Sequence, residues 1–202
     1  MRKTINTKSA AWLLMAFLLA GVAACKQQAP EKKFNSIDIT SADFGHDFRL
    51  TDHFGKVRTL SDFKNKIVII FFGYTHCPEV CPSTMSDLSH ALKSLGNDAG
   101  KVQVLFVTLD PERDTQALLA KYVPSFSPDF LGLYGDKAAT EKVAKDFRIF
   151  FQKQKGKSSQ QYDLDHTAGA YVFDQSGKIR LFLRYGQGAE SIAQDLRKLL
   201  VP

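Results

Sequence analysis

The chain has 202 residues, the length of one folded domain with short appendages. It contains 27 Lys and Arg against 21 Asp and Glu, a formal net charge of +6, and the first 24 residues supply three of the basic residues and no acidic one. The rest of the chain therefore carries a net charge of only +3, which argues against a nucleic-acid-binding protein.

Residues 1–24 have the pattern of a secretion signal. Basic residues near the start precede an apolar run at 10–20, about half the ~20 residues that a membrane-spanning helix needs. The letters V-A-A-C that end at Cys25 resemble a bacterial lipobox, in which the signal is removed and the cysteine carries lipid. A plain signal peptide with an incidental cysteine is the alternative.

The residues after Cys25 predict a flexible tether and the membrane to which the protein is sent. Residues 25–40 include a polar, aperiodic stretch with Pro30, which is typical of a flexible tether, and the folded domain is expected over 41–202. Lys26 follows the lipobox cysteine in place of Asp, which resembles lipoproteins sent to the outer membrane. We therefore expect a lipid-anchored domain on the periplasmic side of a bacterial membrane, with the outer membrane favoured.

The first predicted elements are a β-hairpin and a buried strand. Two extended segments at 48–51 and 57–60 flank the turn sequence D-H-F-G. Residues 67–72 are all apolar and mostly β-branched or aromatic, which is typical of a strand covered on both faces in a parallel sheet. This strand is expected to end at Gly73.

A helix is predicted from about Pro82 to Leu95, because proline is favoured at the first helical position. Apolar side chains recur along it at helical spacing and are expected to pack on the sheet. They are Met85, Leu88, Leu92 and Leu95. Met85 has the soft sulfur of a metal ligand, but its place in this stripe favours core packing.

The remaining pattern alternates between strands and helices. The predicted segments are a strand at 102–109, a helix ending near 123, a strand at 130–134, a helix at 138–147, extended residues at 149–151, a hairpin at 168–173 and 179–183, and a helix at 189–200. This order predicts an α/β protein with a thioredoxin-like fold, an added N-terminal β-hairpin and an insertion between the βαβ and ββα halves.

Cys77 and Cys81 lie between the buried strand and the following helix, where the reactive groups of parallel sheets collect. Their four-residue step is about one helical turn, which brings both sulfurs to one side of the junction. They are then close enough to form a disulfide or to chelate one soft cation. The start of the helix favours thiolate over thiol.

His166 is the third predicted ligand, at the start of the strand that opens the second hairpin. In thioredoxin-like folds this position faces the cysteine loop and usually holds a cis-proline, but no proline lies between Pro128 and Pro202. Two thiolates and one imidazole suit copper as Cu(I) and as Cu(II). Zinc usually recruits a fourth ligand, and a histidine that only caps the strand is the structural alternative.

Other polar residues have weaker claims. His76 adjoins Cys77 as a second-choice ligand, and Asp165 is a candidate to orient the imidazole. The remaining histidines, His46, His53 and His90, are expected to be solvated. Local helix capping and pairing are expected of Asp110, Arg113 and Asp114. A solvated loop, or steering of an acidic partner, is expected of Lys153, Lys155 and Lys157.

Four motifs occur in an order that resembles the Sco/SenC family. They are G-Y-T-H-C-P-E-V-C-P, T-L-D-P-E-R-D-T at 108–115, Y-V-P-S-F-S-P with G-L at 132–133, and Y-D-L-D-H-T at 162–167. The resemblance covers 48–201. It implies a thioredoxin-like fold, copper bound by Cys77, Cys81 and His166, and a partner in the dinuclear copper centre of cytochrome c oxidase subunit II.

Three functions follow from these residues. The first is a copper metallochaperone, which His166 favours because a disulfide reductase needs no imidazole there. The second is a thiol-disulfide oxidoreductase that uses the Cys77/Cys81 pair to reduce partner disulfides or to protect against oxidants. The third, a peroxidase-like antioxidant, lacks the expected Thr-x-x-Cys arrangement. We expect a monomer.

Overall fold

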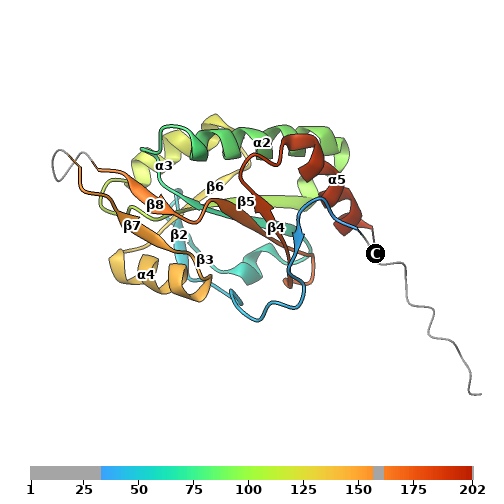
Figure 1. The fold of residues 1–202 in the computed structure, drawn as a ribbon, viewed down its shortest axis with the longest axis horizontal. Helices are drawn as coiled ribbons and strands as arrows, with labels where there is room; N and C mark the ends of the chain where they lie inside the picture. Colours follow the sequence, from blue (N-terminus) through green and yellow to red (C-terminus); the bar gives the residue numbers. More distant parts are fainter. Residues whose placement is uncertain (1–32, 157–161, 202) are drawn as a thin grey trace, which may run out of the picture. The chain divides into compact units, whose positions relative to one another are not determined.

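A mixed sheet forms the centre of the domain in the computed structural model, which describes residues 33–156 and 162–201 (Figure 1). In these residues its eight strands follow the order β1-β10-β9-β4-β5-β6-β2-β3. Their bounds are β1 Ile37–Asp38, β2 Leu50–Asp52, β3 Val57–Arg58, β4 Ile67–Gly73, β5 Val102–Thr108, β6 Leu131–Tyr134, β9 Gly169–Phe173 and β10 Ile179–Arg184. A separate antiparallel pair, here called the β7–β8 ribbon, consists of Phe151–Lys153 and Leu164–His166.

β4 and β5 occupy the middle of the sheet, and all their residues are buried. They pair in parallel from Ile67 opposite Val102 to Gly73 opposite Thr108. The apolar sequence of β4 and the mostly apolar sequence of β5 suit this position because both faces of the strands are covered. Parallel strands also end at one edge of the sheet, so the loops after β4 and β5 emerge side by side.

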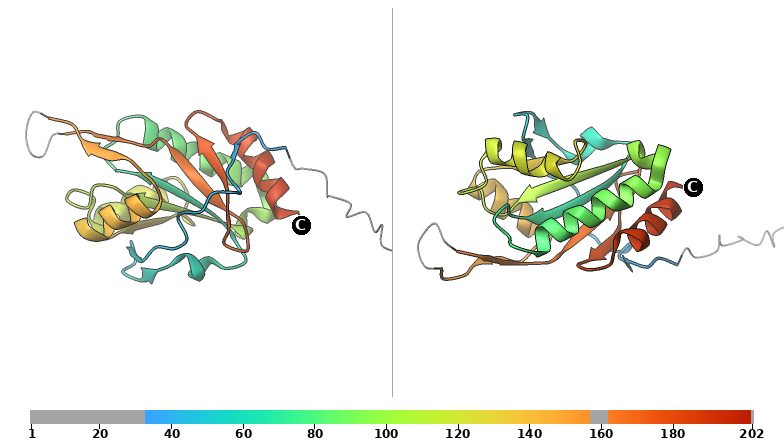
Figure 2. Two further views of the ribbon diagram at one scale, coloured as in Figure 1. Left: turned by 60° about the horizontal axis from the view of Figure 1, so that its bottom comes forward. Right: turned by 90° about the horizontal axis from the view of Figure 1, so that it is seen from above.

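Helices cover both faces of the sheet. α2 (Val80–Leu95) and α5 (Ala189–Leu200) lie side by side on one face, and α4 (Lys137–Asp146) lies on the other (Figures 1 and 2). The shorter α3 is Gln116–Tyr122, and the 3₁₀ helices are η1 Leu60–Phe63, η2 Gly96–Lys101 and η3 Val123–Ser125. The predicted stripe on α2 is buried against the core, and Met85 is 0% exposed.

The predicted fold class is confirmed. β4, α2 and β5 form the βαβ half, β9, β10 and α5 form the ββα half, and β9 runs antiparallel between β10 and β4. The predicted N-terminal hairpin is β2–β3. The insertion contains α3, β6, α4 and the β7–β8 ribbon. Of the described residues, none belongs to a helix both long and apolar enough to cross a bilayer.

The compact unit that contains the sheet begins at Phe34, before the predicted boundary at 41. β1 pairs with β10 at the edge of the sheet, so the predicted tether over 25–40 extends too far. The buried Asp195 carboxylate accepts hydrogen bonds from the backbone N–H groups of Asn35 and Ser36 at 2.9 and 2.8 Å. The polar residues Asn35 and Ser36 pack against the domain because they hydrogen-bond to the buried Asp195. This partner is 159–160 residues away, so the local sequence does not predict the contact. The predicted signal and lipidated Cys25 lie outside the described residues.

Candidate metal centre

The cysteine segment leaves the sheet at the end of β4. At Gly73 an added Cβ would lie 2.8 Å from the Cys81 Sγ and 3.1 Å from the Phe106 ring. A larger residue would collide with the sulfur. Glycine therefore allows Cys81 to lie directly against the end of the strand.

α2 begins at Val80, earlier than predicted, so Pro82 lies inside the first turn and not at the first helical position. The first N–H groups of a helix have no acceptor within the helix, and proline loses no hydrogen bond there. Cys81 thus belongs to the first turn. Its backbone N–H donates to the Cys77 Sγ at 3.4 Å, which stabilises negative charge on that sulfur.

The two free thiols differ in environment. Cys77 is half-buried, and Cys81 is 0% exposed. The hydrogen bond shared between the sulfurs lowers the pKa of Cys77 well below its ordinary value, and backbone N–H groups lower it further against the effect of burial. The same shared hydrogen bond, with burial, raises the pKa of Cys81. Cys77 is therefore the thiolate of the pair.

His166 is the last residue of β8, and not the first of β9 as predicted. Its Nε2 lies 3.8 Å from the Cys81 Sγ, and its Nδ1 lies 3.0 Å from the Thr167 carbonyl oxygen. A carbonyl oxygen only accepts, so Nδ1 carries the proton in the neutral ring. The Nε2 lone pair consequently points toward the sulfurs, where it is available to a metal.

The structure brings the three predicted ligands together. One ligand atom from each of Cys77, Cys81 and His166 lies within 4.8 Å of the others. Metal–sulfur and metal–nitrogen bonds are about 2.3 and 2.0 Å long, so two donors of one ion lie at most roughly 4.6 Å apart. The three atoms can therefore hold one metal ion after small side-chain movements.

Tyr74 links the cysteine loop to the histidine segment. Its ring lies edge-on to the His166 imidazole, with centroids 5.9 Å apart and an interplanar angle of 84°. Burial raises the pKa of Tyr74 to about 12, although its hydrogen bond with the Leu164 backbone acts in the opposite direction. The neutral phenol thus packs and hydrogen-bonds against β8.

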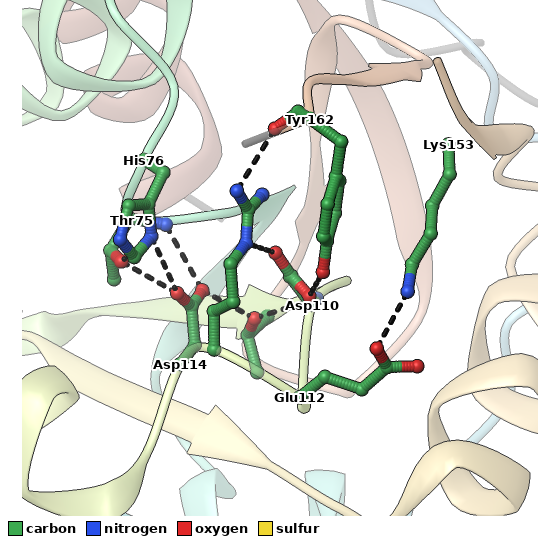
Figure 3. A network of polar contacts seen from close by, with 9 residues as sticks. Thr75, His76, Asp110, Glu112, Asp114, Lys153 and Tyr162 are labelled. Carbon is green, nitrogen blue, oxygen red and sulfur yellow. Dashed lines mark hydrogen bonds and ion pairs between the residues drawn. The ribbon is translucent and has the colours of Figure 1, made fainter. Parts of the chain in front are cut away.

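The turn after β5, residues 110–114, carries a polar network that Figure 3 shows. Asp114 is fully buried and faces the cysteine loop. It accepts hydrogen bonds from the Thr75 backbone N–H at 3.0 Å, from the Thr75 hydroxyl at 2.5 Å and from the Thr108 hydroxyl at 2.6 Å. The turn therefore fixes the loop that contains Cys77.

The same turn contacts the histidine segment. The Tyr162 hydroxyl donates to Asp110 at 2.6 Å, and the Arg113 guanidinium donates to Asp110 and to the Tyr162 carbonyl oxygen (Figure 3). The predicted local pairing is confirmed for Arg113 and Asp110, whose side chains form an ion pair at 2.5 Å. The predicted helix capping is wrong, because Thr115 caps α3, and the three residues also have distant partners. These distant partners lie 39–52 residues away in the sequence.

Two predicted roles of other residues are also wrong. Asp165 is exposed and accepts a hydrogen bond from Gln154, whereas the imidazole of His166 is oriented by the Thr167 carbonyl. His53 is buried, because its Nδ1 accepts the backbone N–H of Gly132 at 2.9 Å. Sequence reasoning missed this because the turn D-H-F-G looks polar, while β2 packs beside β6.

The remaining candidates lie at the surface. His76 is exposed near Asp114, with 3.6 Å between its Nδ1 and the carboxylate, and is outside the three-residue cluster. His46 and His90 are exposed, as predicted. Lys153 forms an ion pair with Glu112 at 2.7 Å, and Lys155 is exposed. Lys157 lies outside the described residues.

Fold and site together define a thioredoxin-like protein with a two-cysteine, one-histidine metal centre at the end of its central strand. The SCO1/SenC family model matches residues 38–201. The chain therefore belongs to the SCO1/SenC family, as its motifs suggested.

Known relatives agree with this assignment. The mitochondrial SCO2 homolog of Bos taurus is 36% identical over 154 residues, which are 75% of this chain and 58% of that protein. Bradyrhizobium japonicum ScoI, solved with copper bound, is 40% identical with a TM-score of 0.72 and covers 78% of this chain and 99% of that one. Yeast Sco1 with copper bound is 30% identical with a TM-score of 0.71 and covers 78% and 88%. The chain thus spans less than two thirds of the bovine protein's length.

Proposed function

We propose that this protein binds one copper ion through Cys77, Cys81 and His166 and acts as a copper metallochaperone. The observation that carries the proposal is the convergence of two sulfurs and one imidazole nitrogen within 4.8 Å. Thiolates favour Cu(I), and the nitrogen makes Cu(II) acceptable. A redox-neutral zinc site would usually add a fourth ligand, and the cluster in the described residues has three.

The proposed target is the dinuclear copper site of cytochrome c oxidase subunit II. Membership of the SCO1/SenC family supports this target. The half-buried Cys77 and His166 give a partner's ligands access to the metal, while the buried Cys81 retains it until transfer. The protein would exchange ligands with its partner and turn over no substrate.

The proposed location is the periplasmic side of a bacterial membrane, with lipid on Cys25. The sequence V-A-A-C-K supports this anchor and favours the outer membrane. The compact unit that contains the sheet begins at Phe34, and residues 26–33 are proposed to connect it to the lipid. The domain is proposed to act as a monomer.

Thiol-disulfide exchange is the second candidate function, favoured by the unequal cysteines. The Cys77 thiolate would attack one sulfur of a partner's disulfide, form a mixed disulfide and release the other partner sulfur as a thiolate. The Cys81 sulfur, after loss of its proton, would attack the Cys77 sulfur and release the second partner thiolate. The partner gains two electrons, and Cys77 and Cys81 become a disulfide. Oxidation would also remove both thiolate ligands, so the two functions can be coupled.

A copper titration of the reduced protein separates the two functions. Wild type is compared with His166→Ala, Cys77→Ser and Cys81→Ser, with bound metal and sulfur-to-Cu(II) absorption as readouts. One tightly bound copper per chain, with the Cu(II) signal lost in all three variants, supports the metallochaperone. Little copper bound by wild type, or equal binding without His166, rejects the three-ligand site and leaves disulfide exchange as the primary activity.

A further inference from the structure

The β7–β8 ribbon lies outside the main sheet, so no strand pairing of the main sheet reaches His166. Among the described strands β8 pairs with β7 alone, with His166 opposite Phe151. Figure 2 shows the ribbon extending beyond the main sheet. The distance between His166 and the cysteines therefore depends on side-chain contacts that reach β8.

Arg113 makes the most extensive of these contacts. Its Nη1 donates to the Tyr162 carbonyl oxygen at 2.9 Å, and its guanidinium lies 3.6 Å from the centroid of the Tyr162 ring. The guanidinium is also 5.8 Å from the Tyr74 ring, which packs on the imidazole. The Arg113 side chain is 8% exposed, so these interactions are little weakened by solvent.

A buried carboxylate holds Arg113 in place. Asp110 is 1% exposed and holds Arg113 through its Nε while it accepts the Tyr162 hydroxyl. Asp114, in the same turn, holds the cysteine loop through Thr75. One turn therefore contacts both segments that carry metal ligands, and Arg113 is its connection to the histidine side.

We propose that Arg113 is a positioning residue that sets the gap between the His166 Nε2 and the Cys81 Sγ, and that it thereby selects for Cu(II) binding. The inference rests on the proposed copper function. Cu(I) is satisfied by the two sulfurs. Cys81 lies in α2 against the end of β4, and the loop with Cys77 is held by Asp114 through Thr75. Neither contact uses the Arg113 side chain. Cu(II) needs the imidazole nitrogen as well, so loss of Arg113 weakens Cu(II) binding and largely spares Cu(I) binding.

The test is Arg113→Met, which keeps an unbranched side chain but removes the charge and the hydrogen bonds. Loss of a group that orients a metal ligand typically lowers affinity about 10-fold to 100-fold. We expect a loss of this size for Cu(II), with weaker sulfur-to-Cu(II) absorption, and a change below about threefold for Cu(I) in a chelator competition. In metal-free protein, backbone hydrogen exchange over 162–166 should become faster.

Arg58→Met is the matched control. Arg58 also pairs with a buried aspartate, Asp52 at 2.7 Å, and lies 5.8 Å from an aromatic ring, that of Phe63. It belongs to the β2–β3 hairpin and contacts neither ligand segment in these pairs. It should leave the ratio of Cu(II) to Cu(I) affinity and the exchange of residues 162–166 unchanged.

Arg113→Lys is a second variant that tests the inference if Arg113→Met does not fold. Lysine keeps the charge beside Asp110 but lacks the planar guanidinium that stacks and donates at once, so Cu(II) affinity should again fall selectively. Equal losses of Cu(I) and Cu(II), or no loss of either in a folded variant, overturn the inference. If wild type binds no Cu(II) through His166, the proposed copper function is rejected. In that case the hydrogen exchange of metal-free Arg113→Met still tests the positioning role, and unchanged exchange over 162–166 would reject it.

Discussion

The two segments that carry the metal ligands are held in different ways. The cysteine segment continues from β4, whose residues are all buried, into α2, whose apolar face packs on the sheet. The histidine segment lies in the β7–β8 ribbon, outside the main sheet. Each buried Ile or Phe contributes about 1.5–3 kcal/mol, whereas a hydrogen bond contributes about 0.5–1.5 kcal/mol, or up to about 3 kcal/mol when charged.

The two kinds of metal ligand therefore depend on different interactions. The Cys81 sulfur is fixed by the core of the domain, where many residues share the stabilisation, and the adjoining loop with Cys77 is fixed by Asp114.

The imidazole contacts the Tyr74 ring and the Thr167 carbonyl oxygen, and Arg113 contacts the same segment at Tyr162. Of the residues at 162–166, the side chains of Tyr162 and Leu164 are buried. Single substitutions should therefore alter the histidine side without unfolding the protein, and alter the cysteine side only at a cost in stability.

The largest expected effect comes from His166→Ala. The side chain is only half-buried, so its loss should lower Cu(II) affinity more than about 100-fold while the free energy of unfolding changes by less than about 1 kcal/mol. Copper titration and urea denaturation measure the two quantities. His90→Ala, on the exposed side of α2, is the control, and an equal copper loss there would contradict the assignment.

The next largest expected effect is a weak pH dependence of the reaction rate of Cys77. Its pKa is lowered, so its thiolate persists as the pH falls, whereas an ordinary thiol with a pKa near 8.5 loses roughly 100-fold of its thiolate between pH 8 and pH 6. We expect the rate of iodoacetamide labelling at Cys77 in metal-free protein to change less than about threefold over this range. Peptide mass spectrometry locates the label. A rate that falls in parallel with that of glutathione would exclude a stabilised thiolate.

Gly73→Ala tests the cysteine side through the core. The added Cβ meets the Cys81 Sγ at 2.8 Å and the Phe106 ring at 3.1 Å, so one of them must move. Overpacking of this kind costs about 1–3 kcal/mol in the free energy of unfolding, and Cu(I) and Cu(II) binding should weaken together. Gly100→Ala is the control because an added Cβ there has no neighbour within 4 Å. Unaltered stability of Gly73→Ala would mean that the sulfur is not confined by the strand.

The smallest expected effect is that of Lys153→Met on the histidine side. The Lys153–Glu112 ion pair is roughly half exposed on both sides, and exposed pairs contribute less than about 1 kcal/mol. Copper affinity should therefore stay within about twofold of wild type. Lys137→Met, at another exposed lysine paired at 3.9 Å with Glu141, is the control. A loss of Cu(II) affinity in Lys153→Met as large as that in Arg113→Met would show that the exposed Lys153–Glu112 pair holds the ribbon in place.

The cysteine side could be predicted from the sequence more fully than the histidine side. A continuous apolar run located β4, a mostly apolar run located β5, and the helical spacing of the Met85 stripe located the buried face of α2, because buried positions are mostly apolar. The Cys77–Cys81 spacing gave the proximity of the sulfurs. The start of α2 was misplaced because Pro82 is tolerated anywhere in the first turn.

The histidine side depends on contacts between distant segments. β7 and β8 are three residues each, and only the predicted extended segment at 149–151 overlaps the ribbon, at Phe151. β8 was not predicted, and His166 was assigned to the wrong strand. Asp110, Arg113 and Asp114 were predicted to act locally, since a short charged cluster does not reveal partners far along the chain. Two signals were present: the cluster follows a buried strand at the edge where β4 also ends, and Tyr162 interrupts a polar stretch.

X-ray absorption spectroscopy of the Cu(II)-loaded protein tests this account most directly. The method counts the atoms bound to copper and distinguishes sulfur from imidazole nitrogen. We predict two sulfur ligands, from Cys77 and Cys81, and one imidazole, from His166, with the imidazole signal absent in His166→Ala. Copper bound to oxygen and nitrogen without sulfur, or to two sulfurs without imidazole, would contradict a site assembled from a core-held pair and a separately held histidine.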